Sequence, residues 1–269
     1  MRSAVLIRSA RHTARDIAQW DANESVDAIV ATSRKLSERT AVALDDMAAF
    51  AALGRCYVGV SWGKDSVVVA HLAATLSRLR GLRIPIVWVR REPVDNPECS
   101  VVRDAFMRAH GMWLDLHEIR VDCERDPLRP ECWWPVGVTA RTATSRPKQI
   151  GFARAAAAHG DRYISGVRAA ESGQRVSRMR SYGVSTARTC APIGWWSTAE
   201  VFAYLLGHAL PVHPAYAYTA GGMYQRDRLR VGSIGSHHGQ GHGRAEWEMR
   251  YYPEIARLTH AAAHVDFSP

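Results

Sequence analysis

The stretch that decides the fold is Tyr57-Val58-Gly59-Val60-Ser61-Trp62-Gly63-Lys64-Asp65-Ser66. Its first four residues are mostly apolar and β-prone, which predicts a short buried strand. Small and polar residues follow as a loop, and residues 67–80 have the apolar spacing of a helix that Gly81 can stop. The first N–H groups of a helix have no partner inside it, so a strand, a tight loop and a helix N-terminus together predict a phosphate site.

The loop does not have the spacing of a Walker A motif, which places four residues between its first Gly and the Gly-Lys pair. Only Trp62 separates Ser61 from Gly63. The loop instead resembles the PP-loop of the ATP pyrophosphatase superfamily, Ser-Gly-Gly-Lys-Asp-Ser, with Trp62 in place of a Gly. A Trp is possible there only if the residue needs no positive φ and its ring points away from the ligand. The alternative is an ordinary βα turn rich in small residues.

Length and composition favour one large α/β domain with a substantial core, since the chain has 269 residues of which 47% are hydrophobic. No apolar run approaches the roughly 18 residues of a membrane span, and we expect a cytoplasmic protein without a membrane partner. The five cysteines lack C-x-x-C spacing and fit a reduced compartment. A net charge of +9, carried mainly by Arg, favours anionic partners or reflects Arg-rich composition alone.

Alternating strand and helix patterns predict parallel βαβ units. We expect strands at 84–89, 114–121 and 162–167, helices at 97–110 and 148–159, and a final helix at 244–264. Two helices at 21–36 and 40–53, the second capped by Thr40, precede the first strand. The predicted organisation is an N-terminal helical segment (1–54), a nucleotide-binding domain (55–220), and a His/Gly-rich loop with a C-terminal helix (221–269).

Four arginines follow the strand expected at 162–167: Arg168, Arg175, Arg178 and Arg180. Because carboxyl ends of parallel strands meet at one edge of a sheet, we expect these guanidinium groups to converge on the phosphate loop. The planar fork of arginine suits bidentate phosphate or sulfate recognition. The alternative is a solvated basic loop. Residues 124–145, with Trp133 and Trp134, predict an ordered insertion whose aromatic rings either anchor the loop or stack on a base.

Three further motifs make the resemblance more specific. They are Gly166 to Ser172 with Arg175, Pro192 to Trp196 before a helix, and Leu210-Pro211-Val212-His213-Pro214-Ala215-Tyr216. Their order and spacing look like the phosphoadenosine phosphosulfate (PAPS) reductase-like branch of the PP-loop superfamily, over residues 55 to 220. The resemblance implies a Rossmann-like, adenine nucleotide alpha-hydrolase-like open parallel sheet with helices on both faces.

The resemblance also implies an enzyme that binds ATP and Mg²⁺, splits ATP between the α and β phosphates, and transfers the adenylyl group. Lys64, Asp65 and Arg168 are the implied catalytic residues, and Asp65 the implied metal ligand. The implied nucleotide-binding residues are Ser61, Trp62, Gly63, Lys64, Asp65, Ser66, Asp95, Gly166, Arg168 and Arg175. An anionic acceptor, either sulfate or a group in nucleic acid, and a homo-oligomeric state are further expectations.

The tail separates this chain from reductases of the family. Relatives often have cysteines after a comparable Arg-x-Gly segment, where this chain has Ser233 and Ser236, and no cysteine follows Cys190. This argues against an iron–sulfur cluster at that place. His237, His238 and His242 either contact phosphate or form a loop near the site. Three functions therefore stay open: an adenylating ATP pyrophosphatase, a sulfonucleotide reductase that uses Cys190 or another thiol, and a non-catalytic nucleotide- or nucleic-acid-binding subunit.

Overall fold

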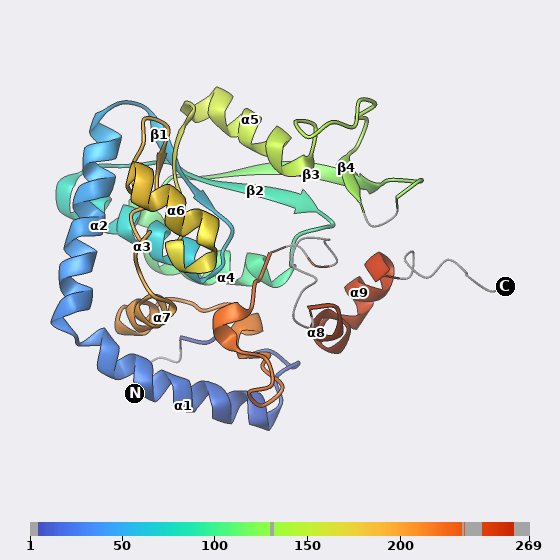
Figure 1. The fold of residues 1–269 in the computed structure, drawn as a ribbon, viewed down its shortest axis with the longest axis horizontal. Helices are drawn as coiled ribbons and strands as arrows, with labels where there is room; N and C mark the ends of the chain where they lie inside the picture. The colour runs from blue at the N-terminus through green and yellow to red at the C-terminus, as the bar shows by residue number, and fades with distance from the viewer. Residues whose placement is uncertain (1–4, 130–131, 233, 235–243, 261–269) are drawn as a thin grey trace.

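A computed structural model describes residues 5–129, 132–232, 234 and 244–260, with side chains described to residue 257. Its centre is a six-stranded sheet of order β4-β3-β2-β1-β5-β6 (Figure 1). All neighbouring strands pair in parallel except β3 and β4, which are antiparallel. The strands are β1 (Cys56–Val60), β2 (Ile86–Glu92), β3 (Leu116–Arg125), β4 (Trp133–Pro135), β5 (Arg162–Ile164) and β6 (Thr189–Cys190). The predicted α/β, Rossmann-like class is confirmed.

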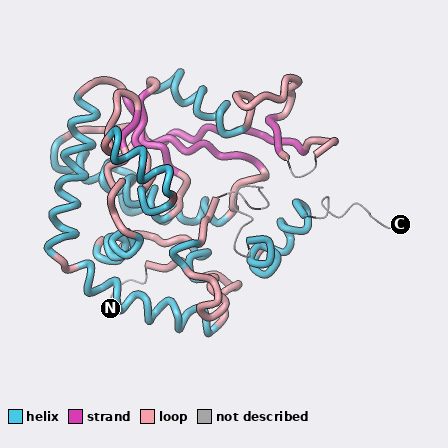
Figure 2. The backbone as a smooth tube through the Cα atoms, in the orientation of Figure 1, coloured by secondary structure: helices cyan, strands magenta, loops and turns pink. Residues whose placement is uncertain are grey.

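Helices cover the sheet on both sides. Figure 1 shows α5 (Pro147–His159) on one side, and α3 (Lys64–Arg80), α4 (Glu98–His110) and α7 (Thr198–Gly207) on the other. The remaining helices are α1 (Ala14–Ala31), α2 (Arg34–Ala52), α6 (Gly173–Tyr182), α8 (Arg244–Tyr251) and α9 (Pro253–His260). Short 3₁₀ turns are η1 (Gly111–Trp113), η2 (Ala169–Glu171), η3 (Pro214–Ala217) and η4 (Arg226–Arg228). Figure 2 shows the long loops on both sides of β4.

β1 lies between β2 and β5, with Val58 paired to Ile86 on one side and to Ile164 on the other. The three side chains are completely buried. A strand covered by helices on both faces buries its side chains on both, which explains why β1 is a short apolar run without polar alternation. The loop that follows β1 therefore lies at the centre of the carboxyl edge of the sheet, where ligands bind in open α/β folds.

The N-terminal helices differ from the prediction. The expected helix over 21–36 is wrong, because α1 ends at Ala31 and Ser33 caps α2 by accepting a hydrogen bond from the Leu36 amide at 3.3 Å. Thr40 is not a cap: it lies inside α2 and its hydroxyl donates to the Leu36 carbonyl at 2.8 Å. Ser and Thr are acceptable at both kinds of position, so the local pattern could not decide between them.

The predicted final helix is divided. α8 ends at Tyr251 and α9 begins at Pro253, because a proline has no amide hydrogen to continue the first helix. Trp247 of α8 is buried and donates its indole N–H to the Tyr218 carbonyl at 2.7 Å. Of the helices described, none is both long enough and apolar enough for a membrane span.

Candidate active site

The loop between β1 and α3 is held close to the segment that follows β5. Gly63 is the N-cap of α3, and the helix begins at Lys64. A Cβ atom at Gly166 would lie 2.8 Å from the carbonyl carbon and oxygen of Asp65, closer than real Cβ contacts. Gly166 therefore lets the two chain segments touch. Whether Gly166 also contacts a nucleotide stays a prediction.

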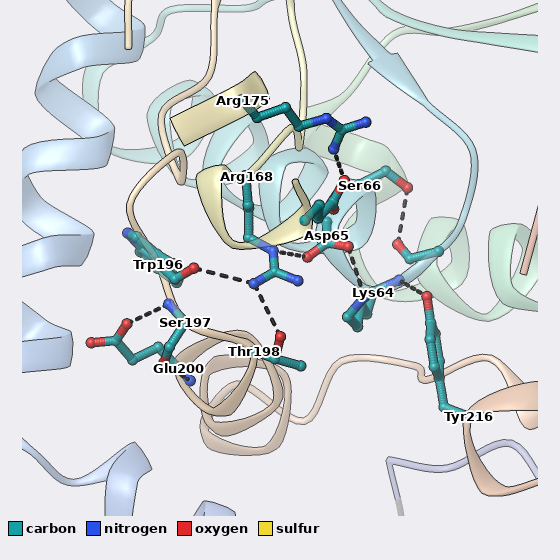
Figure 3. A network of polar contacts seen from close by, with 12 residues as sticks. Lys64, Asp65, Ser66, Arg168, Arg175, Trp196, Ser197, Thr198, Glu200 and Tyr216 are labelled. Atoms are coloured by element: carbon teal, nitrogen blue, oxygen red, sulfur yellow. Dashed lines mark hydrogen bonds and ion pairs between the residues drawn. The ribbon is translucent and has the colours of Figure 1, made fainter. Parts of the chain in front are cut away.

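Asp65 joins the two principal cations of the site (Figure 3). Its Oδ2 lies 3.0 Å from Nζ of Lys64, and its Oδ1 accepts a hydrogen bond from Nε of Arg168 at 2.6 Å. The side chains of Lys64 and Arg168 are only 6% and 2% exposed. The structure thus brings together the three residues predicted to be catalytic, from the start of α3 and from the segment after β5, which are more than 100 positions apart in the sequence.

Arg168 is fixed by further contacts. Its Nη1 donates to the Trp196 carbonyl at 3.1 Å and to the Thr198 hydroxyl at 3.2 Å. Both acceptors belong to the entry into α7, whose capping box is formed by Ser197 and Glu200 (Figure 3). The Pro192 to Trp196 motif and the Gly166 to Ser172 motif are therefore parts of one hydrogen-bonded unit. A buried guanidinium with three acceptors is well compensated for the loss of water.

Two of the loop amides already have acceptors inside the protein. The Ser61 amide donates to Oγ of Ser66 at 3.2 Å, and the Lys64 amide donates to the Tyr216 hydroxyl at 3.1 Å. Oγ of Ser66 itself donates to the Gly63 carbonyl at 3.0 Å. A phosphate that binds through the Lys64 amide must therefore displace Tyr216, which belongs to the Leu-Pro-x-x-Pro-x-Tyr motif. Tyr216 is a site residue that the sequence alone did not identify as one.

The expectation for Trp62 is wrong in its backbone and right in the direction of its ring. Trp62 has a φ of +60°, in the left-handed region that the family's Gly adopts freely. Its indole is completely buried against Trp88 and Phe106, with ring centroids at 6.2 and 5.7 Å. Its Nε1 has no hydrogen-bond partner. The side chain of Trp62 therefore cannot bind a nucleotide. Only the backbone of Trp62 is part of the surface that the loop could present to one.

The expected convergence of four arginines is wrong for two of them. Arg175 lies near Arg168 and forms an ion pair with Glu171; burial and the positive charges of Arg230 and Arg168 lower its pKa. Arg178 instead donates to the Thr189 hydroxyl at 2.9 Å. Arg180 lines a separate pocket. The reason is that residues 173–182 form helix α6, which distributes these side chains around its axis.

Asp95 follows β2 as predicted, but its carboxylate is engaged by its own loop. It accepts the Arg91 amide at 2.9 Å and forms an ion pair with the Arg91 side chain. Lys148, at the start of α5, is a basic group near this edge that the sequence analysis did not single out. Burial lowers its pKa, and the charges of Arg91 and Arg175 lower it further. Lys148 follows the irregular insertion directly, and no motif around it in the sequence indicates a place near the site.

The donor set around Asp65 does not fit a magnesium ion held by the protein. Both of its oxygens are paired with cations, and within the described ranges no three His, Cys, Asp or Glu side chains are grouped to hold a metal. Magnesium usually needs one or two carboxylates besides substrate phosphates. We therefore assign Asp65 to orienting Lys64 and Arg168, and the predicted role as metal ligand is not supported.

Four of the five thiols are poorly suited to nucleophilic chemistry, and only Cys132 is partly exposed. Cys56, Cys99, Cys123 and Cys190 are buried. Burial raises the pKa of Cys190 to about 11 and that of Cys123 to about 11. A thiol reacts as its thiolate, which these environments disfavour. Ser233, Ser236, His237, His238 and His242 lie outside the described residues, and the three-part division of the chain stays a prediction.

Comparisons with known proteins place this geometry in a family. The family described as phosphoadenosine phosphosulfate reductase domain matches residues 55–238. No curated protein matches the chain. The chain also matches solved structures at low similarity. One is phosphoadenylyl-sulfate (PAPS) reductase from Candida auris in its phosphate complex, with 13% identity over 67% of this chain and 89% of that chain, at a TM-score of 0.43.

The other is the U34-tRNA thiolase NcsA from Methanococcus maripaludis with its 4Fe-4S cluster. It is 13% identical over 80% of this chain and 73% of that chain, at a TM-score of 0.39. Since the family model spans most of the chain and includes both the loop and the arginine that meet at Asp65, this chain belongs to the phosphoadenosine phosphosulfate reductase domain family of the PP-loop superfamily.

Proposed function

We propose that this protein is an ATP pyrophosphatase that adenylates an anionic acceptor. The observation that supports this most is the buried Lys64–Asp65–Arg168 unit at the N-terminus of α3. A helix N-terminus and two preorganised cations match the charge of a triphosphate that is being divided. Phosphoryl and nucleotidyl transfer depend on such positioning and neutralisation more than on covalent catalysis.

In the proposed reaction an oxygen of the acceptor attacks the α phosphorus of ATP. The bond from that phosphorus to the α–β bridging oxygen breaks, and pyrophosphate leaves with the electron pair. Lys64 stabilises the charge that grows on pyrophosphate, and the Gly63 amide donates a hydrogen bond to it. The Ser61 amide and the Ser66 hydroxyl donate to pyrophosphate after they leave their acceptors inside the protein. Arg168 and Arg175 bind the α phosphate or the acceptor. Any magnesium would enter with the nucleotide.

The proposal is tested by incubating the protein with ATP labelled at the α phosphate, with sulfate or single-stranded RNA as acceptor. We expect pyrophosphate and labelled AMP or adenylated acceptor. Lys64→Ala should lower the rate by about 100-fold or more, the scale of losing one preorganised charge. Arg34→Ala, which removes an exposed cation paired with Glu38, is the control and should keep the rate. Equal rates for Lys64→Ala and the unaltered protein would refute the assignment.

A sulfonucleotide reductase is the second candidate, supported by the family itself. It would release sulfite from PAPS, and the loss of that activity in Cys190→Ala would select it. The burial and raised pKa of Cys190 argue against it. A non-catalytic subunit would bind nucleotide or nucleic acid without turnover, with binding that weakens steeply as salt increases.

A further inference from the structure

A cavity of about 350 Å³ lies beside the Lys64–Asp65–Arg168 unit and shares Trp196 with the surroundings of Arg168. We call it the Trp195 pocket. Its walls come from α2, from η2 and α6, and from the entry into α7. The residues that matter to its chemistry are Lys35, Arg39, Arg180, Trp195 and Glu200. Neither the family resemblance nor the proposed reaction gives this pocket a role.

Trp195 is an exposed aromatic ring on a fixed backbone. Trp195 is 45% exposed to solvent, whereas the neighbouring Trp196 is only 3% exposed. The Trp195 carbonyl accepts a hydrogen bond from Nη1 of Arg39 at 2.7 Å, and Ser197, two residues further on, caps α7. A large ring held in this way presents a flat apolar face at little entropic cost. Such faces stack on unpaired nucleobases.

The charges of the pocket favour an anion. Glu200 is its single carboxylate, and it is already satisfied: it pairs with Arg39 at 2.5 Å and Lys35 at 3.7 Å, and accepts the Ser197 amide at 2.7 Å. Lys35 is 70% exposed despite this contact. Arg180 is exposed, and among the described residues no carboxylate pairs with it. Three cations therefore face one compensated acid.

We propose that the Trp195 pocket binds an unpaired nucleotide of single-stranded nucleic acid. The base stacks on Trp195, and Lys35 of α2 and Arg180 of α6 contact the phosphates on its two sides. Cations on two different helices suit successive phosphates of a strand better than the single phosphate of AMP. The proposal does not depend on the pyrophosphatase reaction, because it requires only the pocket.

The test measures binding of a fluorescently labelled oligoadenylate of about twelve nucleotides by anisotropy. Trp195→Ala should weaken binding about ten-fold or more, and Trp195→Phe should restore most of it, since stacking is the interaction removed. Arg180→Gln should reduce the slope of log K against log salt by about 0.7, the value for one phosphate contact to a single strand. Thermal melting of each variant shows that folding is unchanged.

Two variants outside the pocket serve as matched controls. Tyr182→Ala removes an exposed aromatic ring of α6, and Arg34→Gln removes an exposed cation of α2. Both should bind as the unaltered protein does. The proposal is overturned if the unaltered protein does not bind the oligonucleotide, if Trp195→Ala binds it equally well, if a duplex of the same length binds as tightly, or if AMP competes as well as the strand does.

Discussion

The carboxylates of Asp65 and Glu200 each pair with two cations, and the two units differ in the burial of those cations. Asp65 pairs with Lys64 and Arg168, whose side chains are at most 6% exposed. Such a unit cannot rearrange without leaving a charge uncompensated in the interior. The Glu200 carboxylate is less exposed than that of Asp65, at 6% against 17%, but its partners Arg39 and Lys35 are 33% and 70% exposed.

The difference indicates what each unit can do. The Asp65 unit has a fixed geometry and suits a reaction in which charge develops at one place. At the Glu200 unit the cations remain in contact with solvent, so they can turn toward a phosphate at little cost. The same comparison extends to one tryptophan beside each unit in the sequence, since Trp62 is buried in the core and Trp195 is exposed.

The largest expected effect compares the two units directly. Arg168→Met should lower the free energy of unfolding by about 3–5 kcal/mol, because Asp65 loses one of two buried partners. Arg39→Met should lower it by about 1–2 kcal/mol, because its guanidinium is partly solvated and Lys35 remains. Urea denaturation of both variants measures the difference. If both variants lose the same free energy of unfolding, the burial of the cations does not determine how much each ion pair contributes to stability.

Replacing the buried tryptophan should have the next largest effect. Trp62→Gly leaves a cavity between Trp88 and Phe106, which costs about 3–5 kcal/mol, and relieves a left-handed backbone worth about 1–2 kcal/mol. We expect a net loss of about 2–3 kcal/mol. Trp195→Ala should change the free energy of unfolding by less than about 1 kcal/mol, as surface substitutions do. A Trp62→Gly protein as stable as the original would mean that the loop collapses to fill the space.

Acid should weaken the scaffold of the active site. His213, whose ring lies near Tyr216, is buried, and burial lowers its pKa to about 3. Between about pH 6.5 and 3 the unfolded chain therefore binds a proton that the folded chain does not. The free energy of unfolding should fall as pH decreases through this window, by at most about 1.4 kcal/mol per pH unit for this residue.

His213→Asn provides the control for that effect, since its amide oxygen can accept the Ala215 amide as Nδ1 of His213 does at 3.1 Å. Denaturation at several pH values should show a smaller slope for this variant. His71, whose pKa burial also lowers to about 3, contributes equally to both proteins. An unchanged slope would mean that protonation of His213 does not differ between the folded and the unfolded chain in this pH window.

The smallest expected effect concerns the Lys64 amide. Tyr216→Phe removes the hydroxyl that accepts this amide, so an incoming phosphate has one acceptor fewer to displace. We expect ATP to bind about two- to ten-fold more tightly, the equivalent of one net hydrogen bond. Calorimetric titration with ATP measures this. Weaker binding would instead assign the Tyr216 hydroxyl to a contact with the nucleotide.

Some features of the structure could be predicted from local sequence patterns, and others could not. The helix after the loop and its stop at Gly81, in left-handed conformation with φ +66°, were predictable because apolar spacing and a glycine are local signals. Asp65 and Arg168 could be nominated from motifs, but their mutual pairing depends on the register of β1 with β5. The left-handed backbone of Trp62 contradicted its residue type, since the packing of its ring outweighs the strain.

The amino-acid sequence by itself determined the alternation of strands and helices, the phosphate loop and the family motifs, because each depends on residues close together in the chain. Tertiary structure alone decided that Tyr216 covers an amide of the loop, that both oxygens of Asp65 are paired, and that Arg180 faces a different pocket from Arg168. These outcomes depend on how distant segments approach one another, and the energy of such contacts is set by burial and orientation that no local pattern contains.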